Sequence, residues 1–181
     1  MGAHLSPMTS RTLSSGKHAY IHNPPTLDVA IQTSIHADGR SIFHALTMPE
    51  YIEVWMCLPV ADARSRVSVL RVSQSYRIDF YRLGELDTSI TGLFKICQPD
   101  KLVLTWRKFG VLDDAQSVVN IHIQEGSAQS SVKLRHVGLP SFEESRWHWQ
   151  MWNNSVKKLT GLFEYSGMVD TAANAETGVN C

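Results

Sequence analysis

Side chains suited to a buried surface recur at alternating spacings of three and four residues between Phe142 and Phe163, the period of one face of an α-helix. This face consists of Phe142, Ser145, Trp149, Trp152, Val156, Leu159 and Phe163. Ser141, followed three residues later by Glu144, has the form of a capping box and marks the start of the helix. The pattern therefore predicts a long C-terminal helix whose aromatic face needs a large apolar partner.

Earlier in the chain the pattern changes to a period of two, which is typical of half-buried β-strands. The first run has Val29, Ile31, Thr33 and Ile35 on one face. The later runs have Val67 and Val69; Tyr76, Ile78 and Phe80; Ile90, Leu93, Phe94 and Ile96; Leu102, Leu104 and Trp106; Val119, Ile121 and Ile123; and Val132 and Leu134. The connections between the later runs are short and rich in turn residues, so they predict hairpins and an antiparallel meander.

Two short helices are predicted between the first strand and the meander. Asp38 can cap a helix over residues 41–46, and Pro49 is well placed as the first residue of a second helix. The order is one strand, two short helices, about six strands and one long helix, which indicates an α+β fold.

The ends of the chain lack this periodicity. Residues 1–25 are rich in Ser, His, Gly and Pro, and we interpret them as a flexible leader. Residues 167–181 also lose the pattern and are predicted to form a disordered tail. The segment 26–166 is the size of one ordinary domain with a single core.

Composition excludes several classes of partner. Lys plus Arg equals Asp plus Glu at 17 each, so no overall field attracts nucleic acid or an anionic membrane, and neither is expected as a partner. The three cysteines form no CxxC pair, which favours a reducing cytoplasm over a disulfide framework. No apolar run is long enough for a membrane span, and the N-terminus lacks the apolar core of a signal peptide.

Four stretches resemble one known family. They are RSIFHALTMPEYIEVW, VSQSYRIDF, TGLFKICQPDKLVLTWR and VKLRHVGLPSFEESRWHWQMW. The residues of these stretches and the order of the stretches are similar to the activator of heat-shock protein 90 ATPase homologue family, which belongs to the START-like (SRPBCC, Bet v-type) superfamily. The chain resembles a stand-alone single-domain member of this family. The resemblance implies a helix-grip fold, in which a curved antiparallel sheet of about seven strands wraps around the C-terminal helix and leaves an apolar cavity. Ser73 and Gln74 depart from the family, which often has glycines there.

A pocket between such a sheet and helix is predicted to be lined by Trp55, Phe80, Trp106, His122, Trp149 and Trp152. For any one of these aromatic rings alone, core packing is the favoured interpretation, and the pocket is inferred from the rings together. His122 lies on the polar side of its strand with Asn120 and Gln124, which favours an outward orientation over a polar corner of the pocket. His136 and His148 are interpreted as hydrogen-bonded structural residues.

The sequence assigns no catalytic residue, metal ligand or cofactor. HxH, HExxH and CxxC spacings are absent, as are a GxSxG elbow and a Gly-rich phosphate loop. The neighbours of Cys57 and Cys97 are those of buried small hydrophobes rather than of activated thiols.

Three functions remain. We favour binding of a small apolar or amphipathic ligand in the cavity. The family resemblance also implies a chaperone-associated co-regulator linked to the stress response. A cyclase- or hydratase-type enzyme would need His122, Glu53 or Asp79 as its acid or base, and we favour this less. A homodimer is expected only because homodimers are common among small domains.

Overall fold

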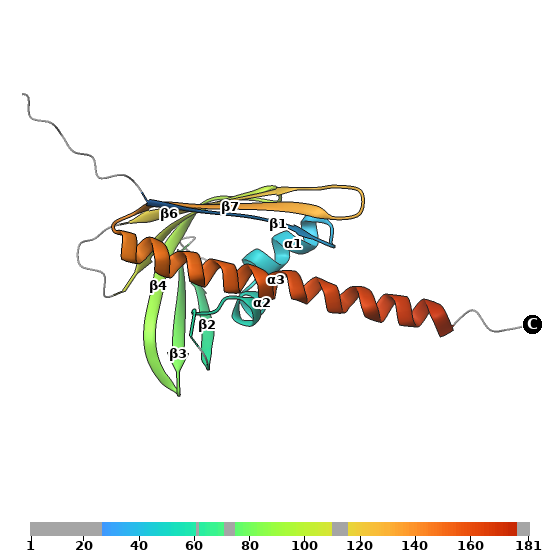
Figure 1. Cartoon of the computed structure of the whole chain (residues 1–181), viewed down its shortest axis with the longest axis horizontal. Helices are drawn as coiled ribbons and strands as arrows, with labels where there is room; N and C mark the ends of the chain where they lie inside the picture. The colour runs from blue at the N-terminus through green and yellow to red at the C-terminus, as the bar shows by residue number, and fades with distance from the viewer. Residues whose placement is uncertain (1–26, 61, 71–74, 110–115, 177–181) are drawn as a thin grey trace, which may run out of the picture.

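The computed structural model of the protein describes residues 27–60, 62–70, 75–109 and 116–176 (Figure 1). The elements follow the predicted order and are β1 (Leu27–Ile35), α1 (Gly39–Thr47), α2 (Pro49–Trp55), β2 (Ala63–Leu70), β3 (Ser75–Arg82), β4 (Glu85–Gln98), β5 (Lys101–Lys108), β6 (Ser117–Gln124), β7 (Ser130–Leu139) and α3 (Phe142–Glu176). Residues 1–25, Ser73 and Gln74 lie outside the described residues.

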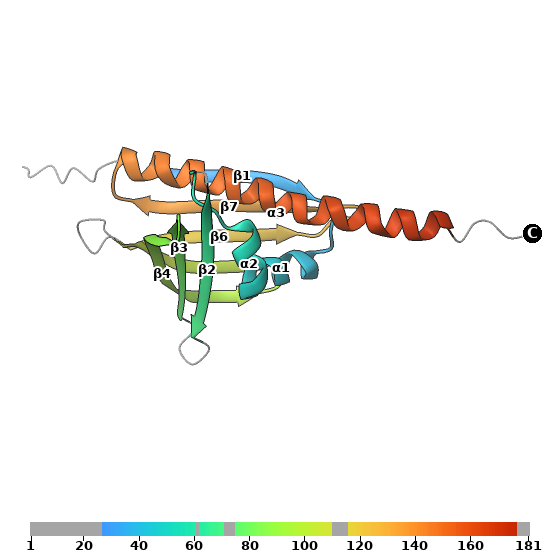
Figure 2. The same ribbon diagram turned by 90° about the horizontal axis from the view of Figure 1, so that it is seen from below.

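The strands form one antiparallel sheet of seven strands in the order β1-β7-β6-β5-β4-β3-β2. Strands β2 to β7 are a meander of neighbours, and β1 joins the sheet beside β7. The sheet bends strongly: β1, β7 and β6 form one layer, and β2, β3 and β4 turn away from it (Figures 1 and 2). Helix α3 runs along the inner side and packs on β1 and β7. The predicted helix-grip fold is confirmed.

The turn chemistry read from the sequence sets the starts of the two short helices. The side chain of Asp38 accepts hydrogen bonds from the Ser41 amide and hydroxyl, each at 2.8 Å, and thereby caps α1. Pro49 is the first residue of α2, where its missing N–H is not needed. Both predictions are confirmed, although α1 begins at Gly39 rather than at Ser41.

Only half of the predicted capping box at the start of α3 is present. The amide of Glu144 donates to the Ser141 hydroxyl over 3.1 Å, as expected. The Glu144 carboxylate does not complete the box, because it turns to β5 and accepts a hydrogen bond from Lys108 Nζ at 3.0 Å. A charge-assisted bond to an ammonium group outweighs one to a backbone amide.

Helix α3 turns a different face inward over its first turns from the predicted one. Phe142 and Trp149 are 73% and 53% exposed, so their predicted inward placement is wrong. Among residues 142–164 of α3, whose burial the structure describes, the buried side chains are His148, Met151, Trp152, Ser155, Val156 and Leu159. The rotation has a polar cause: His148, the neighbour of Trp149, is hydrogen-bonded to Trp106 of the sheet.

Helix α3 also continues to Glu176, beyond the predicted start of a tail at residue 167. The last turns are rich in alanine, which favours helix without any apolar periodicity. The helix thereby extends past the end of the sheet (Figures 1 and 2). No described helix combines the length and apolar character needed to cross a membrane.

Candidate functional site: an apolar cavity with an indole–imidazole wall

An apolar cavity of about 30 Å³ lies between the curved sheet and the three helices. Its lining comes from eight elements or their ends: Leu46, Ile52, Trp55, Met56, Val67, Tyr76, Ile78, Phe94, Leu104, Trp106, Ile121 and Trp152. This volume is about that of one water molecule in the liquid. The space predicted between sheet and helix is therefore present but small.

Three of the six predicted pocket residues meet at this cavity, namely Trp55, Trp106 and Trp152. Phe80 is fully buried in the core but does not line the cavity. His122 and Trp149 are exposed, and His122 has the outward orientation that its strand pattern favoured.

The remaining lining residues were not singled out from the sequence. Most of them are the inward positions of alternating strands, for example Ile78, Leu104 and Ile121, so the pattern did predict their burial. It carries no signal for which inward side chains leave a space between them, since that depends on how the sheet bends.

Every indole N–H at the cavity is bonded to the protein. Trp55 Nε1 donates to the carbonyl of Ala45 at 2.7 Å. Trp106 Nε1 donates to His148 Nε2, and Trp152 Nε1 donates to His136 Nδ1, each at 3.1 Å. The tryptophans therefore present only their apolar ring surfaces to the cavity.

The hydroxyl of Tyr76 is also engaged, because it donates to the carbonyl of Thr105 at 2.6 Å. Burial raises the pKa of Tyr76 above its usual value, so the phenol stays neutral. The side chain reaches Thr105 by crossing Gly92, where an added Cβ would lie 2.6 Å from the tyrosine oxygen. Because Gly92 has no side chain, the Tyr76 ring can pass over β4 and reach β5.

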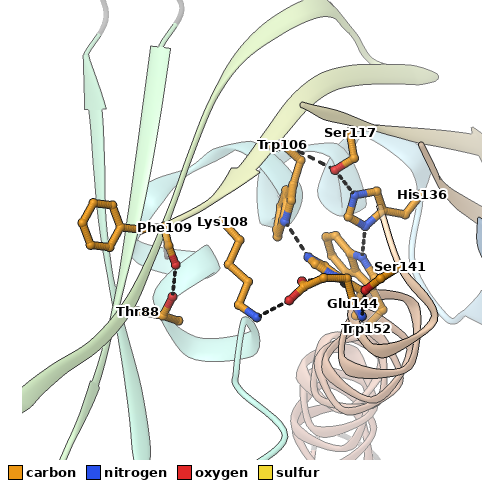
Figure 3. Close-up of polar contacts among 10 residues, drawn as sticks. Thr88, Trp106, Lys108, Phe109, Ser117, His136, Ser141, Glu144 and Trp152 are labelled. Atoms are coloured by element: carbon orange, nitrogen blue, oxygen red, sulfur yellow. Dashed lines mark hydrogen bonds and ion pairs between the residues drawn. The ribbon is translucent and has the colours of Figure 1, made fainter. Parts of the chain in front are cut away.

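The two buried histidines each have one defined tautomer, because an indole can only donate. His136 Nδ1 accepts from Trp152, so His136 Nε2 carries the proton and donates to Ser117 Oγ at 2.7 Å. The Ser117 hydroxyl in turn donates to the carbonyl of Trp106 at 3.1 Å. Figure 3 shows this chain running from α3 through β7 to β5 and β6. Each group in the chain donates to the next, in the order Trp152, His136, Ser117 and the Trp106 carbonyl.

His148 is fixed in the opposite tautomer. Its Nε2 accepts from Trp106, so Nδ1 carries the proton and donates to the carbonyl of Glu144, one turn earlier, at 2.8 Å. The His136 and His148 rings meet edge to face with centroids 4.7 Å apart. Two neutral imidazoles thus share one buried wall with two indoles.

The surroundings keep both imidazoles neutral. Burial, and then the nearby His148, lower the pKa of His136 from 6.5 to about 2. Burial, with a smaller contribution from Lys108, lowers the pKa of His148 to about 4, although the Glu144 backbone bond and charge oppose this shift. If His136 Nδ1 or His148 Nε2 took up a proton, its N–H would point at an indole N–H and the hydrogen bond between them would be lost.

A partly buried ion pair closes the outer end of this wall. Lys108 Nζ lies 3.0 Å from Glu144 Oε1 and 4.0 Å from the centre of the Trp147 ring. The other carboxylate oxygen, Glu144 Oε2, lies 3.5 Å from His148 Nδ1 and has no hydrogen-bond partner among the described residues. The pair fastens the first turn of α3 to the end of β5 (Figure 3).

The comparisons with known proteins agree with this architecture. The model of the family described as "Activator of Hsp90 ATPase homolog 1-like protein" matches residues 36–164. The chain belongs to this family. No curated protein matches it.

Solved structures with the same fold come from several bacteria. A protein from Chromobacterium violaceum has a TM-score of 0.66 at 16% identity, with 76% of this chain and 97% of that chain covered. One from Arthrobacter aurescens has a TM-score of 0.65 at 10% identity, covering 77% and 87%. One from Nitrosomonas europaea has a TM-score of 0.62 at 14% identity, covering 77% and 96%. At these identities the likeness shows the fold alone.

In this family member none of the three groups suggested for acid–base catalysis lines the cavity. Glu53 accepts from the Val67 amide at 2.8 Å, Asp79 pairs with Arg77 at 2.7 Å, and His122 points outward. The described lining residues include no carboxylate, amine or imidazole. The enzyme hypothesis therefore loses the residues on which it depended.

Metal binding and thiol chemistry gain no support either. Within the described residues, no group of three His, Cys, Asp or Glu could hold a metal ion. Cys57 is buried, as predicted, but Cys97 is exposed, so its predicted burial is wrong. It lies near the end of β4, where the strand bulges and alternation no longer indicates burial.

Proposed function

We propose that this family member binds a small apolar or amphipathic ligand between the sheet and α3. One observation carries the proposal: three tryptophan rings converge on a small apolar space, and all their indole N–H groups are bonded to the protein. A concave, apolar, enclosed site is the usual form of a small-molecule site.

The hydrogen bonds restrict the chemistry of the ligand. Since the indoles and the Tyr76 hydroxyl already have partners, a polar group placed among them would lose its own hydration without gaining a bond. Affinity comes instead from apolar area, at roughly 25 cal/mol per Å² removed from water. The polar end of an amphipathic ligand would lie near Val67 and Phe94, which are only half-buried.

A ligand must enlarge the cavity, because about 30 Å³ holds no more than a water molecule. The lining offers one adaptable side chain, Met56, whose unbranched thioether changes shape at low cost. Helices α1 and α2 cover the cavity, and the segment after α2 is tied to α3 by the fully buried Ser155 hydroxyl. This hydroxyl donates to the Cys57 carbonyl at 3.2 Å and accepts from the Cys57 amide at 3.1 Å. We infer that binding shifts the protein toward a state with this cover displaced.

The test uses N-phenyl-1-naphthylamine, a neutral apolar fluorophore. We expect its emission to rise and shift to the blue with the protein, and the melting temperature to increase with fluorophore concentration, since the ligand binds the folded state. Val67→Phe fills the rim of the cavity and should abolish the signal. Val54→Phe makes the same change on a side chain that is 55% exposed, and it should leave the signal intact.

Two results would count against the proposal. One is the absence of any fluorescence or melting response at saturating fluorophore. The other is an equal loss in both variants, which would place the fluorophore on a general apolar surface.

The family description also names activation of the Hsp90 ATPase. A chaperone-associated role rests on this description alone, and ATP turnover by Hsp90 with and without the protein tests it. The homodimer and the cytoplasmic location stay predictions.

A further inference from the structure

A row of basic and imidazole side chains crosses the outer face of the sheet, away from α3. Lys101 on β5 lies directly opposite His122 on β6, and His122 lies directly opposite Lys133 on β7. His122 and Lys133 are exposed, and Lys101 is half-buried. The strand neighbours of all three point into the core, so these side chains lie together on the outside.

This row borders a shallow hollow on the same face. The hollow includes His122 and Lys133, with Asn120, Gln32 and Arg135 beside them. Arg135 is already engaged, since it pairs with Asp28 at 2.7 Å. The hollow therefore combines cations with amide side chains that can both donate and accept hydrogen bonds.

The charge on this face differs from that of the whole chain. Along the row and the hollow beside it, the basic side chains are Lys101, Lys133 and Arg135. The acidic one is Asp28, so three cations and one anion leave a net charge of +2, whereas the chain as a whole carries a net charge of 0. The face is a local positive patch on a neutral protein.

Lys101 and Lys133 both face His122, one from each neighbouring strand, and the row itself contains no carboxylate. The row therefore forms no ion pair within itself. We propose that the outer face of β5, β6 and β7 docks an acidic, extended segment of a partner protein, with Lys101 and Lys133 pairing its carboxylates. Carboxylates supplied by the partner would be the counter-charges that the row lacks.

The same face argues against nucleic acid and anionic membrane as the occupant. Asp28 pairs with Arg135 within the face, so two lysines are left to bind an anion. That is too few for the many phosphate contacts on which nucleic-acid and membrane binding depend. Half-buried Val103, the next outward residue along β5 from Lys101, suits a polypeptide, whose side chains alternate between charged and apolar.

This proposal does not rest on the ligand cavity, which lies on the other side of the sheet. Its test measures the fluorescence anisotropy of a labelled peptide of ten glutamates at low and at physiological salt. We expect binding that weakens with salt. The double variant Lys101→Gln/Lys133→Gln should weaken binding by at least about fivefold, as expected for losing two exposed charge pairs.

The matched control is Lys157→Gln/Lys158→Gln, which removes the same charge from two exposed lysines of α3. It should change the affinity by less than about twofold. No peptide binding at low salt would overturn the proposal, and so would equal weakening by both double variants. Tighter binding of duplex DNA or of phosphatidylserine vesicles than of the peptide at the same salt would also overturn it.

Discussion

Trp106 and Trp152 each border two regions of opposite character. Their ring surfaces line the apolar cavity, whereas their N–H edges are bonded to His148 and His136 in the polar wall. On the cavity side about 30 Å³ is empty, and on the wall side each indole and each imidazole nitrogen has a partner. The same two side chains thus separate a loosely filled region from a fully bonded one.

The difference predicts unequal stiffness. In the wall, the tautomer of each imidazole is fixed, because its accepting nitrogen faces an indole that can only donate. Moving one ring leaves a buried polar atom unpaired. The apolar side chains that line the cavity are held only by dispersion contacts, and they have no such contacts on the side that faces the empty space. We therefore expect ligands to deform the cavity side, with the wall acting as its fixed support.

The largest expected effect comes from removing a ring shared by both regions. Trp152→Ala deletes a fully buried indole and leaves His136 Nδ1 without its donor, so it should lower the free energy of unfolding by about 3–5 kcal/mol. Trp149→Ala, three residues away and 53% exposed, should cost less than about 1 kcal/mol. Urea unfolding measures both. Comparable losses would mean that α3 is rotated as the spacing of its aromatic residues predicted.

That contrast also marks what the sequence could predict. Alternation and turn residues predict the antiparallel meander of β2 to β7 and the burial of Trp106, because each strand signal is local. They do not predict that β1 joins the sheet beside β7. The face of α3 is different: a set containing Trp149 and one containing His148 both fit the helical period next to Trp152. Hydrophobicity favours the first set, and a hydrogen bond from another strand selects the second.

The wall itself could be predicted only in part. The expectation that His136 and His148 are hydrogen-bonded structural residues is confirmed. Their indole partners could not be read from the chain, because His136 Nδ1 meets a residue of α3 and His148 Nε2 meets one of β5. Such pairs depend on how the helix lies in the bent sheet.

The next effect is a loss of stability in acid that originates in the wall. The folded pKa values of His136 and His148 are lowered to about 2 and about 4, below the usual 6.5 of the unfolded chain. Below pH 6.5 the unfolded chain therefore binds protons that the folded protein does not, and stability falls. Each histidine contributes up to about 1.4 kcal/mol per pH unit, until its folded pKa is reached. Between pH 7 and pH 5 we expect a total loss of about 2–4 kcal/mol in urea unfolding.

His136→Phe separates this contribution from general acid effects. At neutral pH the variant should lose about 1–3 kcal/mol, because the Trp152 N–H has no acceptor left. Between pH 7 and pH 5 its stability should fall roughly half as steeply as that of the unchanged protein. His122→Phe alters an exposed imidazole and should keep the full slope. An unchanged slope in His136→Phe would show that the wall is not the source of acid sensitivity.

The smallest expected effect tests the cavity side. Ile78 and Ile90 are paired across β3 and β4 and both are buried, but only Ile78 lines the cavity. Ile→Val at either position removes one methylene and should cost about 0.5–1.5 kcal/mol. We expect the lower part of this range at Ile78, where fewer contacts are lost, together with tighter binding of N-phenyl-1-naphthylamine because the space grows. At Ile90 the cost should be higher and binding unchanged. Equal costs and equal binding would mean that the empty volume does not set the cavity side apart from the ordinary core, and the contrast with the wall would then rest on hydrogen bonds alone.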